Sequence, residues 1–183
     1  MQKLQLKRND YTGKLIVFEG TDGAGKTTMI SMLAELLEGL HRQGNMMVVK
    51  QPTDLSRKTK LFQKMMYSQK HEDVDYRAVQ LLTMSDRIQH GFEIIEPALK
   101  AGKTVICDRY VYTSLANMLA RGYEEETWFY EVSKNLIKPD IIFLAYVIPS
   151  VAIKRIKNRP EEKDRFFDEE LLKKVQSNLR NCL

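Results

Sequence analysis

The chain has 183 residues and a formal net charge of +5, and its 43% hydrophobic and 29% charged content is typical of a globular domain rather than a disordered or collagen-like chain. The longest apolar run, 141–148, is far shorter than the roughly 20 residues of a membrane helix, and residues 1–13 lack the apolar core of a signal peptide. The two cysteines, Cys107 and Cys182, argue against a disulfide framework and indicate a reducing, cytoplasmic location.

The basic charge balance indicates an anionic partner. Charge alone leaves three classes of partner open: nucleic acid, a membrane surface, and small phosphorylated molecules. No internal repeat, low-complexity run or Pro/Gly/Ser-rich linker divides the sequence, so we expect one domain over residues 1–183.

Apolar runs alternate with segments of helical periodicity along the whole chain. In chain order, the patterns predict a strand at 14–19, helices at 27–40 and 61–66 on either side of a strand at 46–50, a long helix at 77–100, a strand at 104–107, helices at 112–119 and 125–136, a strand at 140–147, and helices at 151–157 and 168–179. Pro97 is expected to bend or end the long helix. The alternation predicts an α/β fold with a parallel sheet that carries helices on both faces.

The segment 13–28 combines the first strand with a glycine-rich loop. Its residues 20–27 read Gly-Thr-Asp-Gly-Ala-Gly-Lys-Thr and match the P-loop pattern, and the predicted strand and helix on either side are the context that this motif requires. Backbone N–H groups and the helix N-terminus would bind phosphates, Lys26 can reach the outer phosphates, and Thr27 can bind Mg²⁺. The sequence therefore predicts ATP and Mg²⁺ as cofactors, with phosphates bound by Gly20, Asp22, Gly23, Ala24, Gly25, Lys26, Thr27 and Thr28. An ordinary glycine-rich turn is the alternative.

A second motif, Asp108-Arg109-Tyr110, follows the third predicted strand. Ligands of open α/β sheets bind beyond the carboxyl ends of the strands. An acid at this position can hold magnesium or orient an attacking oxygen, and the planar guanidinium of Arg109 suits phosphate. A salt bridge at the end of the strand is the simpler alternative.

The third motif is an arginine-rich segment at 155–167, with Arg155 and Arg159 four residues apart and Arg165 beyond Pro160. Arginines at this spacing share one face of a helix. Mobile arginines suit a lid that closes over a transferring phosphoryl group and excludes water. A solvated charged surface would produce the same composition.

Taken together, these motifs resemble the thymidylate kinases, a family of P-loop nucleoside monophosphate kinases. The resemblance extends over residues 14–180 and is carried by Phe18–Thr28 (FEGTDGAGKTT), Leu81-Leu82 with Asp86-Arg87, Asp108–Tyr110, Lys138–Asp140, and Ala152–Arg155 leading into the lid. It implies the three-layer P-loop NTPase fold with a short lid, and transfer of the γ-phosphoryl group of ATP to dTMP with Mg²⁺. It also implies a homodimer that binds small nucleotides rather than nucleic acid or membranes.

The resemblance also assigns roles to individual residues. The implied catalytic residues are Lys26, Asp108, Arg109 and Arg159. Lys26 would hold the donor phosphates, Thr27 and Asp108 would hold the metal, and Arg109 would bridge the donor and acceptor phosphates. The implied acceptor-binding residues are Asp22, Lys50, Pro52, Arg87, Arg109 and Asn117.

Several positions depart from the pattern of the family. Thr83 stands where members usually carry an aromatic that stacks on thymine, Asn117-Met118 replaces an aromatic or glutamine, and Lys50-Gln51-Pro52 replaces Arg-Glu-Pro. Phe167 stands where the lid usually carries a glutamate. Gly23 occupies a loop position at which some members carry an arginine, so we expect Arg159 of the lid to supply that positive charge.

These departures leave the acceptor open between dTMP, another nucleoside monophosphate and a deoxynucleoside, and leave open a P-loop protein that binds nucleotide without transferring phosphate. A GTPase is disfavoured because no Asn-Lys-x-Asp motif is present. Family members continue past the helix at 168–179 with a further strand and helix, which we expect to be missing here.

Two further features are predicted to be structural. The basic cluster of Arg57, Lys58, Lys60 and Lys64 is interpreted as a solvated helix face, and Cys107 as a small buried hydrophobe.

Overall fold

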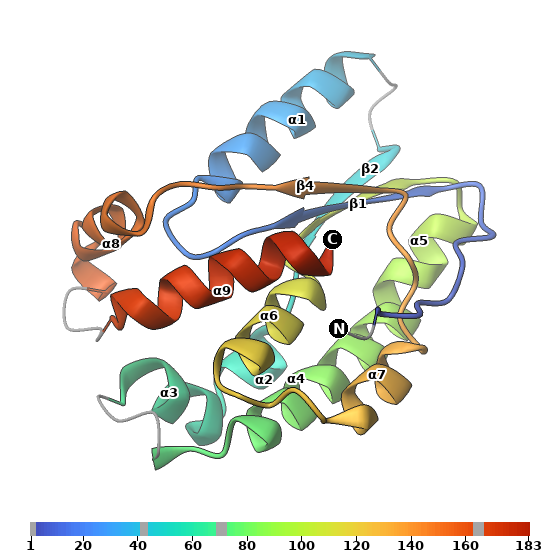
Figure 1. The fold of residues 1–183 in the computed structure, drawn as a ribbon. Coiled ribbons are helices and arrows are strands. Elements are labelled where there is room, and N and C mark those ends of the chain that lie inside the picture. Colours follow the sequence, from blue (N-terminus) through green and yellow to red (C-terminus); the bar gives the residue numbers. More distant parts are fainter. Residues whose placement is uncertain (1–2, 41–43, 69–72, 163–166) are drawn as a thin grey trace.

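A computed structural model describes residues 3–40, 44–68, 73–162 and 167–183. Four parallel strands form one sheet in the order β2 (Met46–Lys50), β3 (Thr104–Asp108), β1 (Lys14–Glu19), β4 (Ile141–Leu144), as Figure 1 shows. All four predicted strands are confirmed. The last is shorter than the predicted 140–147, because its partner β1 ends at Glu19, which pairs with Leu144.

Helices lie on both faces of the sheet (Figure 1). On one face lies α1 (Lys26–Leu40); towards the other lie α4 (Tyr76–His90), α5 (Glu96–Lys100), α6 (Tyr112–Ala120), α7 (Thr127–Ser133) and α9 (Glu169–Cys182). The remaining helices are α2 (Asp54–Arg57), α3 (Lys60–Tyr67), α8 (Pro149–Lys157) and a 3₁₀ turn at Pro160–Glu162. This is the predicted α/β architecture.

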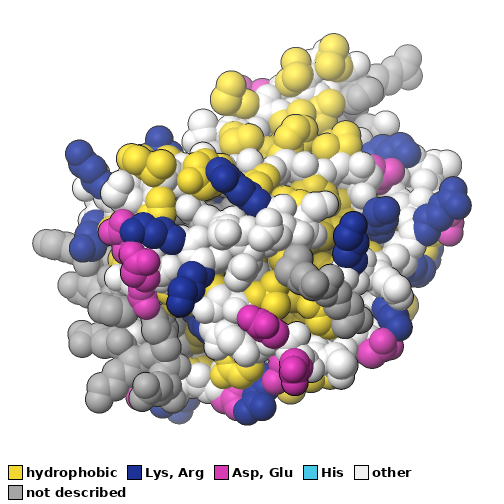
Figure 2. Space-filling model, in the orientation of Figure 1, with side chains coloured by type: hydrophobic (Ala, Val, Ile, Leu, Met, Phe, Trp, Pro, Cys, Tyr) yellow, Lys and Arg dark blue, Asp and Glu magenta, His cyan; other side chains and the backbone are white. Residues whose placement is uncertain are grey.

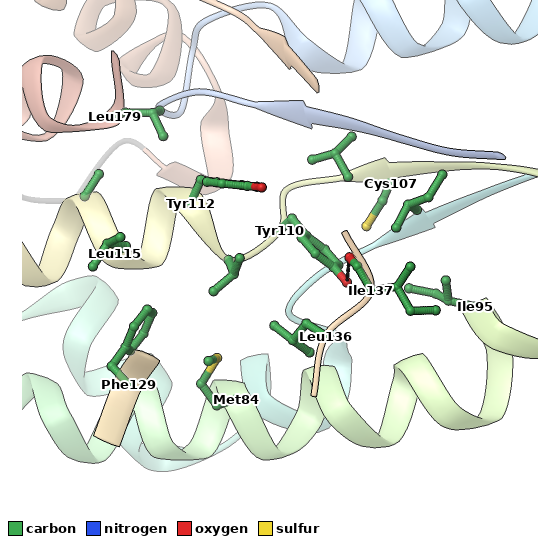
Figure 3. Close-up of a cluster of buried hydrophobic side chains, with 14 of the residues drawn as sticks. Met84, Ile95, Cys107, Tyr110, Tyr112, Leu115, Phe129, Leu136, Ile137 and Leu179 are labelled. Atoms are coloured by element: carbon green, nitrogen blue, oxygen red, sulfur yellow. Dashed lines mark hydrogen bonds between the residues drawn. The ribbon is translucent and has the colours of Figure 1, made fainter. Parts of the chain in front are cut away.

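The period of two along the central strands divides the core between these faces. Leu15 and Val17 of β1 belong to the larger core together with their β3 partners Val105 and Cys107. In Figure 3, side chains of this cluster from α4, α6, α9 and β3 converge, and the Tyr110 hydroxyl donates to the Ile137 carbonyl oxygen at 2.8 Å. Cys107 is fully buried, as predicted.

The opposite face of the sheet is covered less completely. Ile16, Phe18 and Ile106 pack with Ile30 of α1 in a small second core. The outer side of α1 exposes Met32, Leu36 and Leu40, and Figure 2 shows hydrophobic side chains gathered over this helix. Ile141 and Phe143 of the edge strand β4 are also exposed. Among the described residues, the predicted burial of both faces of the sheet therefore holds for the central strands β1 and β3 only. In the described part of the chain, no helix has the length and apolarity needed to cross a membrane.

The long helix predicted at 77–100 is a continuous helical run of mixed type. Between α4 and α5 the backbone forms a π-helical turn at Gly91–Ile95, where the Glu96 N–H bonds to the Gly91 carbonyl. Pro97 lies in the first turn of α5, and the run continues to Lys100. The alternative that Pro97 ends the helix is wrong. The π-helical turn precedes the proline, and Pro97 lies in the first turn of the segment that follows, where its missing N–H can be accommodated.

Two other helices differ from the predicted pattern. The helix predicted at 125–136 is confirmed only over α7, because the N–H groups of Lys134, Asn135 and Leu136 bond to carbonyls three residues back in tight turns. The four-residue helix α2 was not predicted. It is held by Thr53, whose hydroxyl accepts the Leu55 N–H at 3.2 Å as an N-cap.

Candidate active site

The P-loop leaves the carboxyl end of β1 and is packed closely against neighbouring backbone. Gly20 and Gly23 have φ values of +141° and +74°, which side-chain-bearing residues rarely adopt. A Cβ at Gly20 would lie 2.4 Å from the Ala145 carbonyl oxygen, and one at Gly23 would lie 2.5 Å from that of Ala152 in α8. An arginine therefore does not fit at position 23 in this chain, which gives a steric reason for its absence.

Lys26 of the loop is buried, with 6% of its surface exposed. Its Nζ donates to the carbonyl oxygens of Gly20 at 3.0 Å and Thr21 at 2.8 Å. Burial, and then the neighbouring charge of Arg109, lower the pKa of Lys26 to about 7. The Lys26 amine thus lies at the phosphate-binding loop, and near neutral pH it is divided between its protonated and neutral forms.

Arg109 faces the same loop from the carboxyl end of β3. Its backbone is left-handed, with φ of 69°, a conformation uncommon outside glycine and frequent at functional sites. Its Nη1 donates to the Gly20 carbonyl at 2.7 Å and its Nη2 pairs with the Asp22 carboxylate. The P-loop and the Asp-Arg-Tyr motif, far apart in sequence, are thereby joined directly.

Glu19 fixes the backbone that carries Arg109. Its fully buried carboxylate accepts the N–H groups of Tyr110, Tyr112 and Thr113 through Oε1 and the Thr113 hydroxyl through Oε2. It thus satisfies N–H groups at the start of α6 that have no partner within the helix. Sequence reasoning missed this role, although a charged residue at the end of an apolar strand was the available signal.

A cavity of about 300 Å³ opens beside these loops, at the carboxyl edge of the sheet. This lies at the lower end of the range for ligand pockets. Seven predicted site residues from separate parts of the sequence line it: Asp22, Lys50, Pro52, Arg87, Arg109, Asn117 and Arg159. The structure thus brings the whole predicted acceptor set together with one lid arginine.

Other predicted residues lie outside this lining. Lys26 and Thr27 belong to the start of α1, and Asp108 ends β3. Arg155 of α8 donates from Nη1 to the Gly23 carbonyl at 3.2 Å, so it contacts the P-loop rather than the cavity. Arg165 lies outside the described residues, whereas Phe167, at a position where the family pattern has a glutamate, lines the cavity.

Arg87 is the buried cation of the cavity, at 2% exposure. Its Nη2 donates to the Tyr110 carbonyl at 3.1 Å and the Ser114 hydroxyl at 2.9 Å. Its Nε and Nη1 are buried without a hydrogen-bond partner among the described residues, and burial lowers its pKa. Because unpaired buried donors are costly, these atoms mark a place for ligand acceptors.

The position of the missing aromatic holds a satisfied polar pair. The Thr83 hydroxyl lies 3.2 Å from the Gln80 carbonyl and 3.3 Å from the Gln80 side-chain oxygen, and both residues are buried. They line the cavity one and two helical turns before Arg87. The wall here is therefore polar rather than aromatic.

The interpretation of the basic cluster as a solvated helix face is wrong for Arg57. It lines the cavity, its Nε donates to the Pro52 carbonyl at 2.7 Å, and its guanidinium lies 5.7 Å from the centroid of the Phe62 ring. Burial, and then the charge of Arg109, lower its pKa. Lys58, Lys60 and Lys64 are exposed as predicted. The sequence did not separate Arg57 from these lysines because α2, which turns it inward, was not predicted.

Arg121 is a second cation that sequence reasoning missed. It lines the cavity, stacks on Tyr76 with 4.2 Å from its guanidinium carbon to the ring centroid, and donates to Asn117 Oδ1 at 2.7 Å. Asn117 is thereby held within the wall by both α6 and the Tyr76 end of α4. No simple sequence signal distinguishes Arg121 from a surface arginine.

The donor set around the P-loop fits Mg²⁺. Asp108 Oδ1 is buried and has no hydrogen-bond partner among the described residues, and Thr27 supplies a hydroxyl at the start of α1. Within the described chain, no group of three His, Cys, Asp or Glu residues could hold a metal ion. An oxygen-only set of few protein ligands suits Mg²⁺, which completes its shell with phosphate oxygens and water.

A P-loop between β1 and α1, facing a cationic cavity at the carboxyl edge of a parallel sheet, defines a nucleotide phosphotransferase of the P-loop class. The structure is similar to the crystal structure of thymidylate kinase from Ehrlichia chaffeensis, with a TM-score of 0.70 and 24% identity over 92% of this chain and 85% of that one. That likeness shows a shared fold.

Sequence comparison carries the assignment further. Residues 18–183 match the family model described as thymidylate kinase. A probable thymidylate kinase of Thermococcus kodakarensis is 38% identical, with 89% of this chain and 80% of that protein covered. One from Pyrococcus horikoshii is 39% identical, with 91% and 80% covered. The chain belongs to the thymidylate kinase family of phosphotransferases, which confirms the resemblance found in the sequence.

Proposed function

We propose that this chain transfers the γ-phosphoryl group of ATP to the 5′-phosphate of dTMP, giving dTDP and ADP. Family membership and fold support this reaction. The observation that carries it in the structure is the single cavity in which Asp22 of the P-loop, Arg109 of the second motif and Arg87 of α4 meet. Phosphoryl transfer depends mainly on positioning and charge stabilisation, which converging cations provide.

On the donor side, phosphate oxygens would replace the Gly20 and Thr21 carbonyls as partners of Lys26. The residues Gly20 and Asp22 to Thr28 would surround the phosphates with backbone N–H groups at the start of α1. Thr27 and Asp108 would hold Mg²⁺, which when bound neutralises charge on the phosphates. Asp108 Oδ1, which is buried and meets no hydrogen-bond partner within the described ranges, supports that assignment.

On the acceptor side, the nucleotide would span the cavity from its phosphate to its base. Arg109, Arg57 and Lys50 supply cations at the end near the P-loop. Arg87, whose Nε and Nη1 have no hydrogen-bond partner in the described part of the chain, would meet the base, where thymine offers the acceptor oxygen O4. Pro52 and Asn117 would complete the walls.

The segment 155–167 would act as the lid. Arg159 is exposed yet lines the cavity, a placement suited to a group that closes onto the transferring phosphoryl and stabilises its charge. Arg155 would hold the P-loop through the Gly23 carbonyl instead. The lid and the loop thus have separate arginines for separate tasks.

The polar wall at Thr83 favours a second candidate, a kinase of broader nucleoside monophosphate range. An acceptor-dependent assay of ADP release with ATP and Mg²⁺ distinguishes the two, using dTMP, dUMP, the other deoxynucleoside monophosphates and thymidine. We expect turnover with dTMP. Turnover only with another monophosphate would change the substrate, turnover only with thymidine would make the protein a nucleoside kinase, and none with any acceptor would overturn kinase activity.

The family resemblance also leads us to propose a homodimer that works in the cytoplasm on free nucleotides, without a nucleic-acid or membrane partner. Light scattering after size exclusion should give twice the 21.3 kDa chain mass. A monomer mass at assay concentration would refute the dimer.

A further inference from the structure

Asp86 is a buried carboxylate beside the acceptor cavity. The sequence motifs gave this residue no role. It precedes Arg87 on α4 and is 2% exposed. Its Oδ2 accepts the Thr53 N–H at 2.6 Å, and its Oδ1 accepts the Thr53 hydroxyl, also at 2.6 Å. Neither Asp86 nor Thr53 is among the described residues that line the cavity. Both oxygens of a buried charge are thus directed at one residue of a loop.

That residue controls two groups that do line the cavity. The Thr53 hydroxyl gives its hydrogen to Asp86 and accepts the Leu55 N–H at 3.2 Å, which caps α2. Helix α2 ends at Arg57, and Arg57 Nε returns to the carbonyl of Pro52, the residue before Thr53. Fixing Thr53 therefore fixes Pro52 directly and Arg57 through the cap.

Two further contacts hold the loop and the helix α2 that follows it against α4. The fully buried Gln51 places its amide nitrogen 3.1 Å from Nδ1 of His90, one turn beyond Asp86. The Ser56 hydroxyl lies 3.4 Å from the Leu82 carbonyl. The loop between β2 and α2, and α2 itself, are thus attached along α4, the helix that also carries Arg87 into the cavity.

We infer that Asp86 is a positioning residue for the acceptor nucleotide. It sets the separation between the phosphate end of the acceptor site, at Pro52 and Arg57, and the base end at Arg87. This inference rests on the proposed function. The P-loop has no hydrogen bond to Asp86 among those described, so the effect should fall on acceptor binding and spare ATP.

The test is Asp86→Asn, measured by the Michaelis constants for both substrates. An amide of the same shape accepts through one oxygen only, so one of the two Thr53 donors loses its acceptor. The amide NH2 can meet the Thr53 hydroxyl only as a donor, which leaves the hydroxyl hydrogen without its partner. We expect the KM for dTMP to rise at least ten-fold while the KM for ATP stays within two-fold. Thr53→Val, which removes the hydroxyl, should give the same split, and Thr53→Ser, which keeps it, should restore wild-type values.

Asp140→Asn is the matched control. Asp140 is also a carboxylate that accepts a backbone N–H, from Leu15 at 2.9 Å. It lies at the amino ends of β1 and β4, away from the carboxyl ends where the cavity opens. It should leave both constants unchanged. Thermal melts identify variants that are unfolded at the assay temperature, and the milder Thr53→Val carries the test if Asp86→Asn is one of them.

The outcomes separate this inference from the proposed function. Equal changes in both constants, or an unchanged KM for dTMP in folded Asp86→Asn or Thr53→Val, would overturn the positioning role while wild-type turnover upheld the kinase. Absence of wild-type turnover with every monophosphate would overturn both.

Discussion

We predict that the protein takes up a proton at Lys26 when ATP binds, because without ATP this buried amine has a lowered pKa and only carbonyl oxygens as hydrogen-bond partners. A neutral amine has two hydrogens, enough for the Gly20 and Thr21 carbonyls. Lowering a lysine pKa from 10.5 to about 7 corresponds to about 5 kcal/mol against the charged form in this site. Phosphate oxygens favour the charged form, so ATP should bind to the protonated protein and raise the pKa.

The magnitude follows from the titration. With a pKa of about 7, the protonated fraction falls from about 24% at pH 7.5 to about 3% at pH 8.5, so ATP affinity should fall about eight-fold across that range. The γ-phosphate is ionised throughout this range, which leaves Lys26 as the titrating group.

Isothermal calorimetry measures this uptake directly. Titrating ATP at pH 8.5 in two buffers of different ionisation enthalpy should give close to one proton absorbed per ATP bound, and Lys26→Met should bind weakly with no pH dependence over the same range. Flat affinity and no proton exchange in the wild-type protein would refute the reasoning. The same pKa has a stability consequence. Because the folded pKa of Lys26, about 7, lies below the unfolded value of 10.5, the contribution of Lys26 to the stability of the protein without nucleotide should rise between pH 7 and 10 and stay constant below pH 7, where the amine is protonated in both states.

Three substitutions test other parts of the site. Gly23→Ala should lower the melting temperature by several degrees and weaken ATP binding, because its Cβ would meet the Ala152 carbonyl at 2.5 Å on a positive-φ backbone; an unchanged melt with normal ATP binding would contradict the close packing. Arg57→Ala should raise the KM for dTMP ten-fold or more, whereas Lys58→Ala, the exposed neighbour, should not, and steady-state kinetics in which the two variants match would return Arg57 to the surface. Arg159→Ala should lower kcat more than it weakens ATP binding, and equal losses in turnover and in calorimetric affinity would argue against a role in the transition state.

The strands and the P-loop could be predicted because their signals are local. A run such as Leu15–Phe18 is buried on both sides, so it is apolar at every position, and the loop pattern directly reflects the backbone that phosphate requires. The helical pattern of 77–100 is also a local signal. The π-helical turn within it could not be predicted from that pattern, because the turn changes only which carbonyl each N–H reaches.

The residues that were missed depend on contacts distant in sequence. Arg57 points inward only because Thr53 caps a four-residue helix and Asp86, 33 residues later, holds Thr53. Glu19 binds the start of α6, over 90 residues away, and looks in the sequence like the polar end of a strand. Such roles follow from topology, which brings together segments that are distant in the sequence.

The partners of the site cations bear on how the site works. Lys26, Arg57 and Arg155 are each held by neutral carbonyl oxygens, and Arg109 by one carbonyl and the Asp22 carboxylate. A carbonyl keeps a cation in place without neutralising it, so exchange for a phosphate oxygen gains charge attraction and separates no ion pair. Of these four cations, Arg109 is the one that shares its charge with a carboxylate in the described part of the chain, and that carboxylate belongs to the P-loop and lines the cavity. Part of the basic excess of the chain is thus placed around the P-loop and the cavity in cations held mainly by neutral oxygens.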